Sequence, residues 1–125
     1  MTRLLIVEDN AGMRSLIWSV VADLFEAVTE CGDGAGALGA YRECRPDWVL
    51  MDVRMPGLDG ITATALIKEA FPEARIVIVT DYAETKLRRA ALDAGACDYV
   101  LKDDLLELRR IVGGACSFKG APEAG

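Results

Sequence analysis

The hydrophobic residues of the chain fall into five short runs, separated by segments of helical length. The runs occupy residues Leu4–Val7, Ala27–Cys31, Trp48–Met51, Ile76–Val79 and Asp98–Leu101. Most of them are unbroken rather than alternating, which is typical of strands that are buried on both faces of a parallel sheet. The run at residues 27–31 is more polar and suits an edge strand. The pattern therefore predicts five strands.

Five helices are expected between and after these strands. The clearest begins after Asn10, a good N-cap residue, and carries an apolar stripe of Met13, Leu16, Ile17, Val20, Val21 and Leu24. The others are expected at residues 35–43, 59–70, 84–94 and 103–112. In the helix that begins near Asp59 and Gly60, we expect Ile61, Ala65, Leu66 and Ala70 to face the core.

The strict alternation of strands and helices predicts an α/β fold with a doubly wound parallel sheet. A chain of 125 residues with 52% hydrophobic residues fits one domain. We expect this domain to cover residues 1–114, and residues 115–125 to form a flexible tail or the start of a linker. In such folds ligands bind at the carboxyl ends of the strands.

Composition excludes several classes of function. Fourteen basic and twenty acidic residues give a net charge of -6, which disfavours direct binding of DNA or RNA by this segment. The four cysteines are widely spaced and histidine is absent, so a structural zinc site is not expected. The chain shows neither a signal peptide nor an apolar run long enough to span a membrane, and we expect a cytoplasmic protein with reduced thiols.

Acidic residues directly follow two of the predicted strands. Glu8 and Asp9 come after the first strand, and Asp52 comes after the third. If these strands are parallel neighbours, three carboxylates converge at one edge of the sheet, where their repulsion requires protons or a cation. Oxygen ligands alone favour a hard divalent ion, and Mg²⁺ is the natural candidate, with Mn²⁺ as the alternative.

A hydroxyl and an ammonium occur at the ends of the fourth and fifth predicted strands. Thr80 ends the fourth strand and Lys102 follows the fifth. A carboxylate nucleophile, a divalent ion, a hydroxyl and a lysine are the parts that phosphoryl transfer requires. Each residue alone has an ordinary explanation as a turn former, a strand residue or a solvated charge. Their occurrence after the correct successive strands favours the phosphoryl-transfer interpretation.

Four motifs occur in the same order as in a known family. They are V-E-D-N at residues 7–10, L-M-D-V-R-M-P-G-L-D-G at 50–60, I-V-T at 78–80 and Y-V-L-K at 99–102. Over residues 3–112 the chain resembles the receiver domain of bacterial response regulators, and the D-x-x-M-P-x-x-D-G stretch is the most specific part. The resemblance implies a flavodoxin-like (βα)5 fold with strand order 2-1-3-4-5.

The resemblance also implies roles for individual residues. Asp52 would accept a phosphoryl group from a sensor histidine kinase or a phosphotransfer protein, and Lys102 would contact the acyl phosphate. The metal ligands would be Glu8, Asp9, Asp52 and the backbone carbonyl of Arg54. On phosphorylation Thr80 would swing toward the phosphoryl oxygens, and Tyr99 would move inward behind it. These movements would alter the face formed by the fourth helix, the last strand and the fifth helix. The altered face would control an output domain or form a homodimer, and the chain would catalyse only its own phosphorylation and dephosphorylation.

The chain departs from the family pattern at two places. Asp81 stands where a small residue is common, and we expect it to pair with Arg54 across the pocket mouth and to modulate the lifetime of the phosphorylated state. Asp103 follows Lys102 in place of a common proline. This second departure resembles receivers attached to LuxR-type helix-turn-helix domains, which implies a role in transcription regulation. A stand-alone receiver and a receiver with another output domain stay open as alternatives.

Trp18 lies off the apolar stripe of the first helix, so we expect it to be partly exposed. It is a candidate partner surface, although packing against the end of the fifth helix is favoured.

Two other functions stay open. A pseudo-receiver would keep the fold and act as a phosphate-independent interaction module, and Asp81 is the feature in its favour. A haloacid-dehalogenase-like phosphatase would need a second Asp at the position of Arg54.

Overall fold

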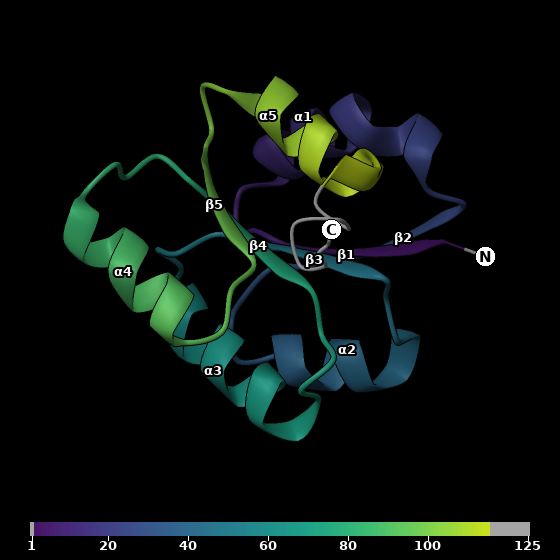
Figure 1. Cartoon of the computed structure of the whole chain (residues 1–125). Coiled ribbons are helices and arrows are strands. Elements are labelled where there is room, and N and C mark those ends of the chain that lie inside the picture. Colours follow the sequence, from purple (N-terminus) through teal and green to yellow (C-terminus); the bar gives the residue numbers. More distant parts are fainter. Residues whose placement is uncertain (1, 116–125) are drawn as a thin grey trace.

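The computed structural model describes residues 2–115 and shows a five-stranded, fully parallel sheet in the order β2-β1-β3-β4-β5 (Figure 1). The strands are β1 (Arg3–Val7), β2 (Ala27–Cys31), β3 (Trp48–Met51), β4 (Ile76–Thr80) and β5 (Asp98–Leu101). Each of them begins and ends within one residue of its predicted bounds. The doubly wound fold class and the strand order are confirmed.

Helices cover both faces of the sheet. They are α1 (Ala11–Val21), α2 (Ala37–Cys44), α3 (Gly60–Ala70), α4 (Thr85–Asp93) and α5 (Leu105–Arg110), with a 3-10 turn η1 (Ala22–Leu24) and a π-helical turn η2 (Ile111–Ala115). In Figure 1, α1 and α5 lie above the sheet, and α2, α3 and α4 lie below it. The prediction for residues 116–125 lies outside the described residues.

The core consists of two apolar layers, one on each side of the sheet. Successive residues of β1 alternate between them: Leu4 and Ile6 pack toward α1 and α5, whereas Leu5 and Val7 pack toward α2 and α3. All four side chains are fully buried. This burial on both faces explains why the central strands are unbroken apolar runs in the sequence.

The pairing of β1 with β3 brings two distant acidic segments together. Val7 is the register partner of Met51, and these are the last residues of their strands. Glu8 and Asp52 therefore leave the sheet side by side, at the carboxyl edge where ligands bind in this architecture.

The pairing of β4 with β5 brings a lysine to the same edge. Thr80 is the register partner of Leu101. Lys102 follows immediately, and its backbone N–H donates to the carbonyl of Thr80 at 2.8 Å. Lys102 therefore lies at the same edge of the sheet as Glu8 and Asp52, each directly after the end of its strand.

Two helices bury a different set of side chains from the predicted one. In α3 the buried residues are Gly60, Ala63, Thr64 and Ile67, whereas Ala65, Leu66 and Ala70 are exposed and Ile61 is half-buried. In α1 Leu16 is 48% exposed, although Ile17 and Val21 are buried as predicted. Alanine is small enough to lie on either face of a helix. The alanines of α3 therefore did not mark which face is buried, and the predicted inward face was wrong.

None of the helices within residues 2–115 has the length and apolar character that crossing a bilayer requires.

An ion pair ties the end of α1 to α5. Arg109 donates to both carboxylate oxygens of Asp23, at 2.6 and 2.9 Å, and to the carbonyl of Val20 at 3.0 Å. The hydrogen bonds from Arg109 lower the pKa of Asp23 below its usual value. As the pH falls, Asp23 is therefore protonated in the unfolded chain before it is protonated in the folded protein. The ion pair stabilises the fold fully above the ordinary pKa of aspartate, and this stabilisation is lost as the pH falls below that value.

We expect Arg109→Gln to lower the unfolding midpoint near neutral pH. The difference from the wild type should narrow as the pH falls below the ordinary aspartate pKa of about 4, because Asp23 then becomes protonated first in the unfolded chain and later in the folded protein. Urea unfolding of both proteins across this range measures the effect. A difference that widens toward low pH would contradict it.

Candidate phosphorylation site

Three carboxylates meet at the carboxyl edge of the sheet. Glu8, Asp9 and Asp52 each offer an oxygen, and these oxygens all lie within 4.8 Å of one another. Glu8 is 2% exposed and Asp52 is 6% exposed, whereas Asp9 is exposed to solvent. The predicted convergence of the acidic residues is therefore found, and the group has the oxygen-only character that a hard divalent cation prefers.

Lys102 is the cation that faces this group. Its Nζ lies 2.9 Å from Oε1 of Glu8 and 3.2 Å from Oδ2 of Asp52. Burial by itself lowers the pKa of Lys102, but the hydrogen bond to Glu8 and the charges of Glu8 and Asp52 outweigh burial and raise the pKa above its usual value. The lysine is consequently charged at neutral pH and lies against the carboxylate of Asp52.

Glu8 is held by the start of α1. Its Oε2 accepts the backbone N–H of Asn10 at 3.1 Å, while its own carbonyl accepts from Arg14 at 2.6 Å. Burial raises the pKa of Glu8, and the nearby charge of Asp52 raises it further. Its Oε1 is buried and faces the ammonium of Lys102, with 2.9 Å between Oε1 and Nζ. A buried carboxylate oxygen beside two further carboxylates fits a ligand of a hard divalent cation.

Asp52 is oriented by its own loop. Its Oδ1 accepts the backbone N–H of Val53 at 2.8 Å, and its Oδ2 faces Lys102. Gly60 begins α3 directly against the main-chain carbonyl of Asp52 and donates its N–H to the carbonyl of Val53 at 2.8 Å. The side chain of Asp52 thus points out of the sheet, with one oxygen fixed and the other beside a cation.

Thr80 and Tyr99 form a chain of contacts through Tyr82. The hydroxyl of Thr80, which is fully buried, accepts the backbone N–H of Tyr82 at 3.4 Å. The hydroxyl of Tyr99 donates to the carbonyl of Tyr82, and Arg88 of α4 lies over the ring of Tyr99 at 5.1 Å. Tyr99 is 3% exposed, so in this structure it already occupies the inward position.

Arg54 contacts Tyr82 rather than the predicted partner Asp81. Its guanidinium lies 4.5 Å from the centre of the Tyr82 ring, and within residues 2–115 no ion pair joins Arg54 to Asp81. The predicted ion pair is therefore wrong for this structure. A guanidinium stacks well on an aromatic face, and an exposed ion pair gains little in water.

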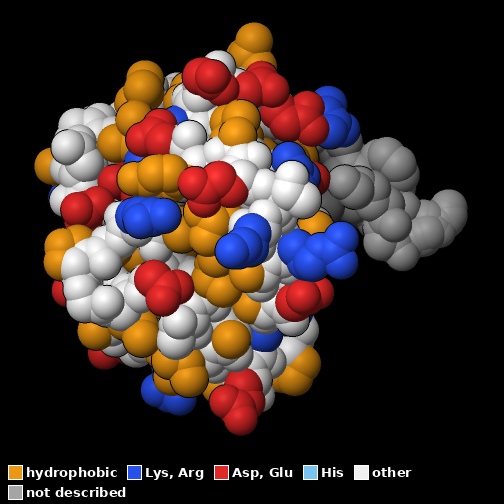
Figure 2. Space-filling view, turned by 90° about the vertical axis from the view of Figure 1, so that its left-hand side faces the viewer, with side chains coloured by type: hydrophobic (Ala, Val, Ile, Leu, Met, Phe, Trp, Pro, Cys, Tyr) orange, Lys and Arg blue, Asp and Glu red, His pale blue; other side chains and the backbone are white. Residues whose placement is uncertain are grey.

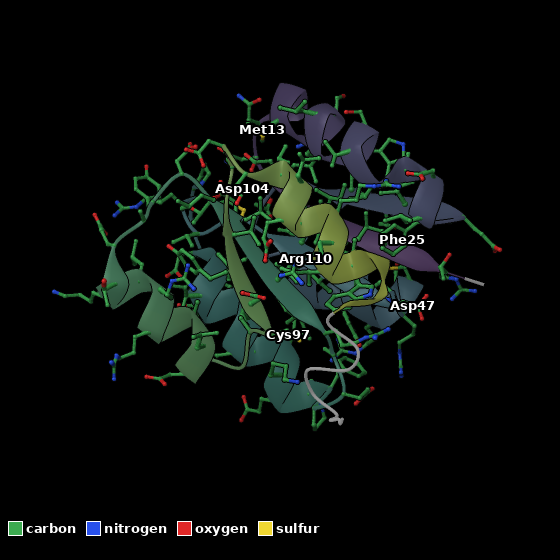
Figure 3. The ribbon with its side chains drawn as sticks, turned by 45° about the horizontal axis from the view of Figure 1, so that its top comes forward. Met13, Phe25, Asp47, Cys97, Asp104 and Arg110 are labelled. Atoms are coloured by element: carbon green, nitrogen blue, oxygen red, sulfur yellow. The ribbon has the colours of Figure 1, made fainter. Side chains whose placement is uncertain are left out.

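Most of the predicted site residues line one pocket, namely Glu8, Asp9, Asp52, Arg54, Asp81 and Lys102. Thr80 and Tyr99 are not part of its wall. Trp18 lies elsewhere: it is half-buried, as the partial exposure predicted for it implies, and it packs against the apolar layer between the sheet and the helices α1 and α5. Figure 3 shows Met13, near the start of α1, and Asp104, near the start of α5, at the same edge of the molecule.

The surface beside the site carries charges of both signs. Figure 2 faces the side on which α4 lies in Figure 1, and it shows acidic and basic side chains interspersed with apolar ones.

Sequence reasoning missed two residues of the site. The role of Asn10 was limited to capping α1, where its Oδ1 accepts from Met13 at 2.8 Å, yet its N–H also holds Glu8. Tyr82 was not singled out, although it contacts Arg54, Thr80 and Tyr99. An aromatic residue two positions after a strand-end threonine, in an otherwise polar loop, is the signal that could have found it.

Comparisons with known proteins agree with this geometry. The family model of the response regulator receiver domain matches residues 4–112. The chemotaxis protein CheY of Bacillus subtilis (strain 168) is 42% identical over 101 residues, which are 80% of this chain and 84% of that protein. The response regulator GacA of Pseudomonas aeruginosa is 35% identical over 109 residues, covering 86% of this chain and 51% of that protein.

A solved structure shows the same fold. The crystal structure of a two-component response regulator of the LuxR family from Aurantimonas sp. SI85-9A1 superposes with a TM-score of 0.85 at 31% identity. The match covers 94% of this chain and 86% of that chain. With the family model matching nearly the whole described chain, the protein belongs to the response regulator receiver domain family.

Proposed function

We propose that this chain takes a phosphoryl group onto Asp52 from the phosphohistidine of a sensor histidine kinase or phosphotransfer protein, in a reaction that needs Mg²⁺ or Mn²⁺. The observation that carries the proposal is the buried contact of 3.2 Å between Lys102 and Asp52. This contact places the ammonium of Lys102 beside the carboxylate of Asp52, in the group that also holds the carboxylates of Glu8 and Asp9. The partners of this reaction would be met in the cytoplasm.

The described residues would act on the phosphoryl group as follows. An oxygen of Asp52 forms the new bond to phosphorus while the bond from phosphorus to the histidine nitrogen breaks, and the histidine leaves neutral after taking a proton. Lys102 neutralises charge on the transferring oxygens, which is the main contribution that a protein makes to this reaction.

A divalent cation fits the same edge. Glu8, Asp9, Asp52 and the backbone carbonyl of Arg54 would hold it, and the gathering of three carboxylate oxygens within 4.8 Å of one another supports this assignment. The ion would supply positive charge that offsets both the carboxylates and the incoming phosphoryl oxygens.

The output would travel through Tyr82. A phosphoryl group on Asp52 offers new acceptors to the hydroxyl of Thr80, which now accepts from the N–H of Tyr82. The movement of this loop reaches Tyr99 through its hydrogen bond to the carbonyl of Tyr82. The face of α4, β5 and α5 then binds a partner differently, whether an output domain that regulates transcription or a second copy of the chain.

The test of the proposal is incubation with acetyl phosphate, with and without EDTA. We expect one phosphoryl group per chain, located on Asp52 by mass spectrometry and absent when the divalent cation is chelated. Absence of modification in both conditions would favour a pseudo-receiver, and rapid release of phosphate with multiple turnovers would favour a phosphatase.

Mg²⁺ is expected to stabilise the fold. A ligand that binds only the folded state at about 100 times its Kd contributes about 2.7 kcal/mol. Thermal unfolding with saturating MgCl2 or with EDTA measures this difference in the wild type and in Glu8→Gln, in which a neutral amide replaces one ligand. The variant should lose most of the stabilisation, and an undiminished response would contradict the assignment of Glu8.

Arg54→Ala is expected to shorten the lifetime of the phosphorylated state. The stack of Arg54 on Tyr82 borders the pocket, and a cation–π contact of this kind contributes about 0.5–1 kcal/mol, which corresponds to roughly two- to fivefold faster hydrolysis when the pocket opens to water. Arg75→Ala is the matched control. The guanidinium of Arg75 stacks on the ring of Trp48, 4.5 Å from its centre, and neither residue lines the pocket. The rate of phosphate release is measured in both variants and in Asp81→Ala. The comparison separates the effect of the stack between Arg54 and Tyr82 from the effect of the Asp81 charge.

A further inference from the structure

Gly34, in the loop between β2 and α2, lies under the loop that follows Asp52. It is buried although its neighbours Asp33 and Ala35 are exposed. Its φ angle lies outside the left-handed region, so backbone conformation does not explain a glycine here. Space does: a Cβ at this position would lie 2.2 Å from the carbonyl oxygen of Leu58 and 3.0 Å from the carbonyl carbon. Such a contact is far inside the van der Waals separation.

The backbone that Gly34 touches continues directly to the phosphorylation site. Leu58 and Asp59 lead into Gly60, where a Cβ would lie 1.7 Å from the main-chain oxygen of Asp52. The three backbone segments are therefore stacked in close contact, from the loop after β2, through the start of α3, to the end of β3. Because these segments are in close contact, a displacement of the Leu58 backbone would also displace the backbone of Asp52.

The loop that carries Gly34 is itself well fixed. Asp33 accepts the backbone N–H of Gly36 through Oδ1 at 2.7 Å, and the carbonyl of Gly34 accepts the N–H of Ala37 at 3.2 Å. At its other end, the carbonyl of Cys31 accepts the N–H of Glu8 at 3.0 Å. A displaced Leu58 therefore cannot be accommodated by free movement of this loop.

We propose that Gly34 is a positioning residue for phosphorylation: its bare Cα sets the place of the Leu58–Gly60 backbone and, through it, the orientation of Asp52. This inference rests on the proposed function of Asp52. The inference gives the loop that follows β2 a part in phosphorylation, although no residue of this loop lines the pocket.

The test compares Gly34→Ala with two controls. Gly39→Ala adds a Cβ with nothing within 4 Å, and Leu108→Ala destabilises the opposite apolar layer without touching the site. At a temperature at which all proteins are folded, we expect Gly34→Ala to be phosphorylated by acetyl phosphate at least tenfold more slowly and to bind beryllofluoride with Mg²⁺ more weakly. Both controls should keep the wild-type rate.

A second variant covers the case in which Gly34→Ala does not fold. Asp33→Ala adds no atoms and removes the acceptor of the Gly36 N–H, so it loosens the same loop, and we expect a smaller loss of rate in the same direction. If the wild type is phosphorylated and every loop variant that folds matches its rate, the positioning role is wrong. If the wild type itself takes up no phosphate at Asp52, the proposed function fails instead.

Discussion

Asp52→Asn is expected to take up no phosphoryl group from acetyl phosphate or from a phosphorylated kinase. The amide has nearly the same shape as the carboxylate, and its oxygen can still accept the N–H of Val53, so the fold should be kept. What the variant loses is the anionic oxygen beside Lys102, which is the nucleophile of the proposed reaction. Mass spectrometry after incubation with excess donor measures the outcome.

Asp93→Asn provides the control for this prediction, because Asp93 is an exposed residue of α4 far from the three carboxylates. It should be labelled like the wild type. Labelling of Asp52→Asn at an undiminished rate would identify another acceptor and would end the assignment of the site.

Lys102→Ala is expected to be phosphorylated roughly 100- to 1,000-fold more slowly, the usual cost of removing one group that stabilises charge in a transition state. The same change should tighten Mg²⁺ binding, because Lys102 competes with the cation for Glu8 and Asp52. Opposite effects on rate and on metal affinity would not arise from a general loss of structure.

Initial rates with acetyl phosphate and calorimetric titration with Mg²⁺ measure the two effects separately. Lys86→Ala is the control, since Lys86 is an exposed cation on α4. Equal rates in Lys102→Ala and Lys86→Ala would show that the contact between Lys102 and Asp52 has no part in the transfer.

Strands and strand ends were the most predictable parts of this protein. The apolar runs specified the five strands within one residue, and the signal was strongest in β1, β3 and β4, where burial on both faces leaves little room for polar side chains. Once the order of the sheet is known, the residues that follow the strands must meet at one edge. Glu8, Asp52 and Lys102 could therefore be placed together from the sequence.

Side-chain choices within loops and helices were less predictable. The sequence offered Asp81 as a partner for Arg54, but the choice between a carboxylate and the ring of Tyr82 depends on loop geometry that periodicity does not encode. In α3, the polar Thr64 is fully buried while Leu66 is 39% exposed, which inverts the usual preference. The role of Gly34 was also hidden, since a single glycine in a loop has many explanations.

The strand order has a consequence for biosynthesis. Lys102 lies 50 positions after Asp52 and reaches the acidic edge only when β5 has paired with β4, the last addition to the sheet in chain order. A nascent chain that has emerged from the ribosome only as far as β4 carries its acidic residues without their cation. The group of three carboxylates and one lysine should therefore be complete only after the C-terminal strand has joined the sheet.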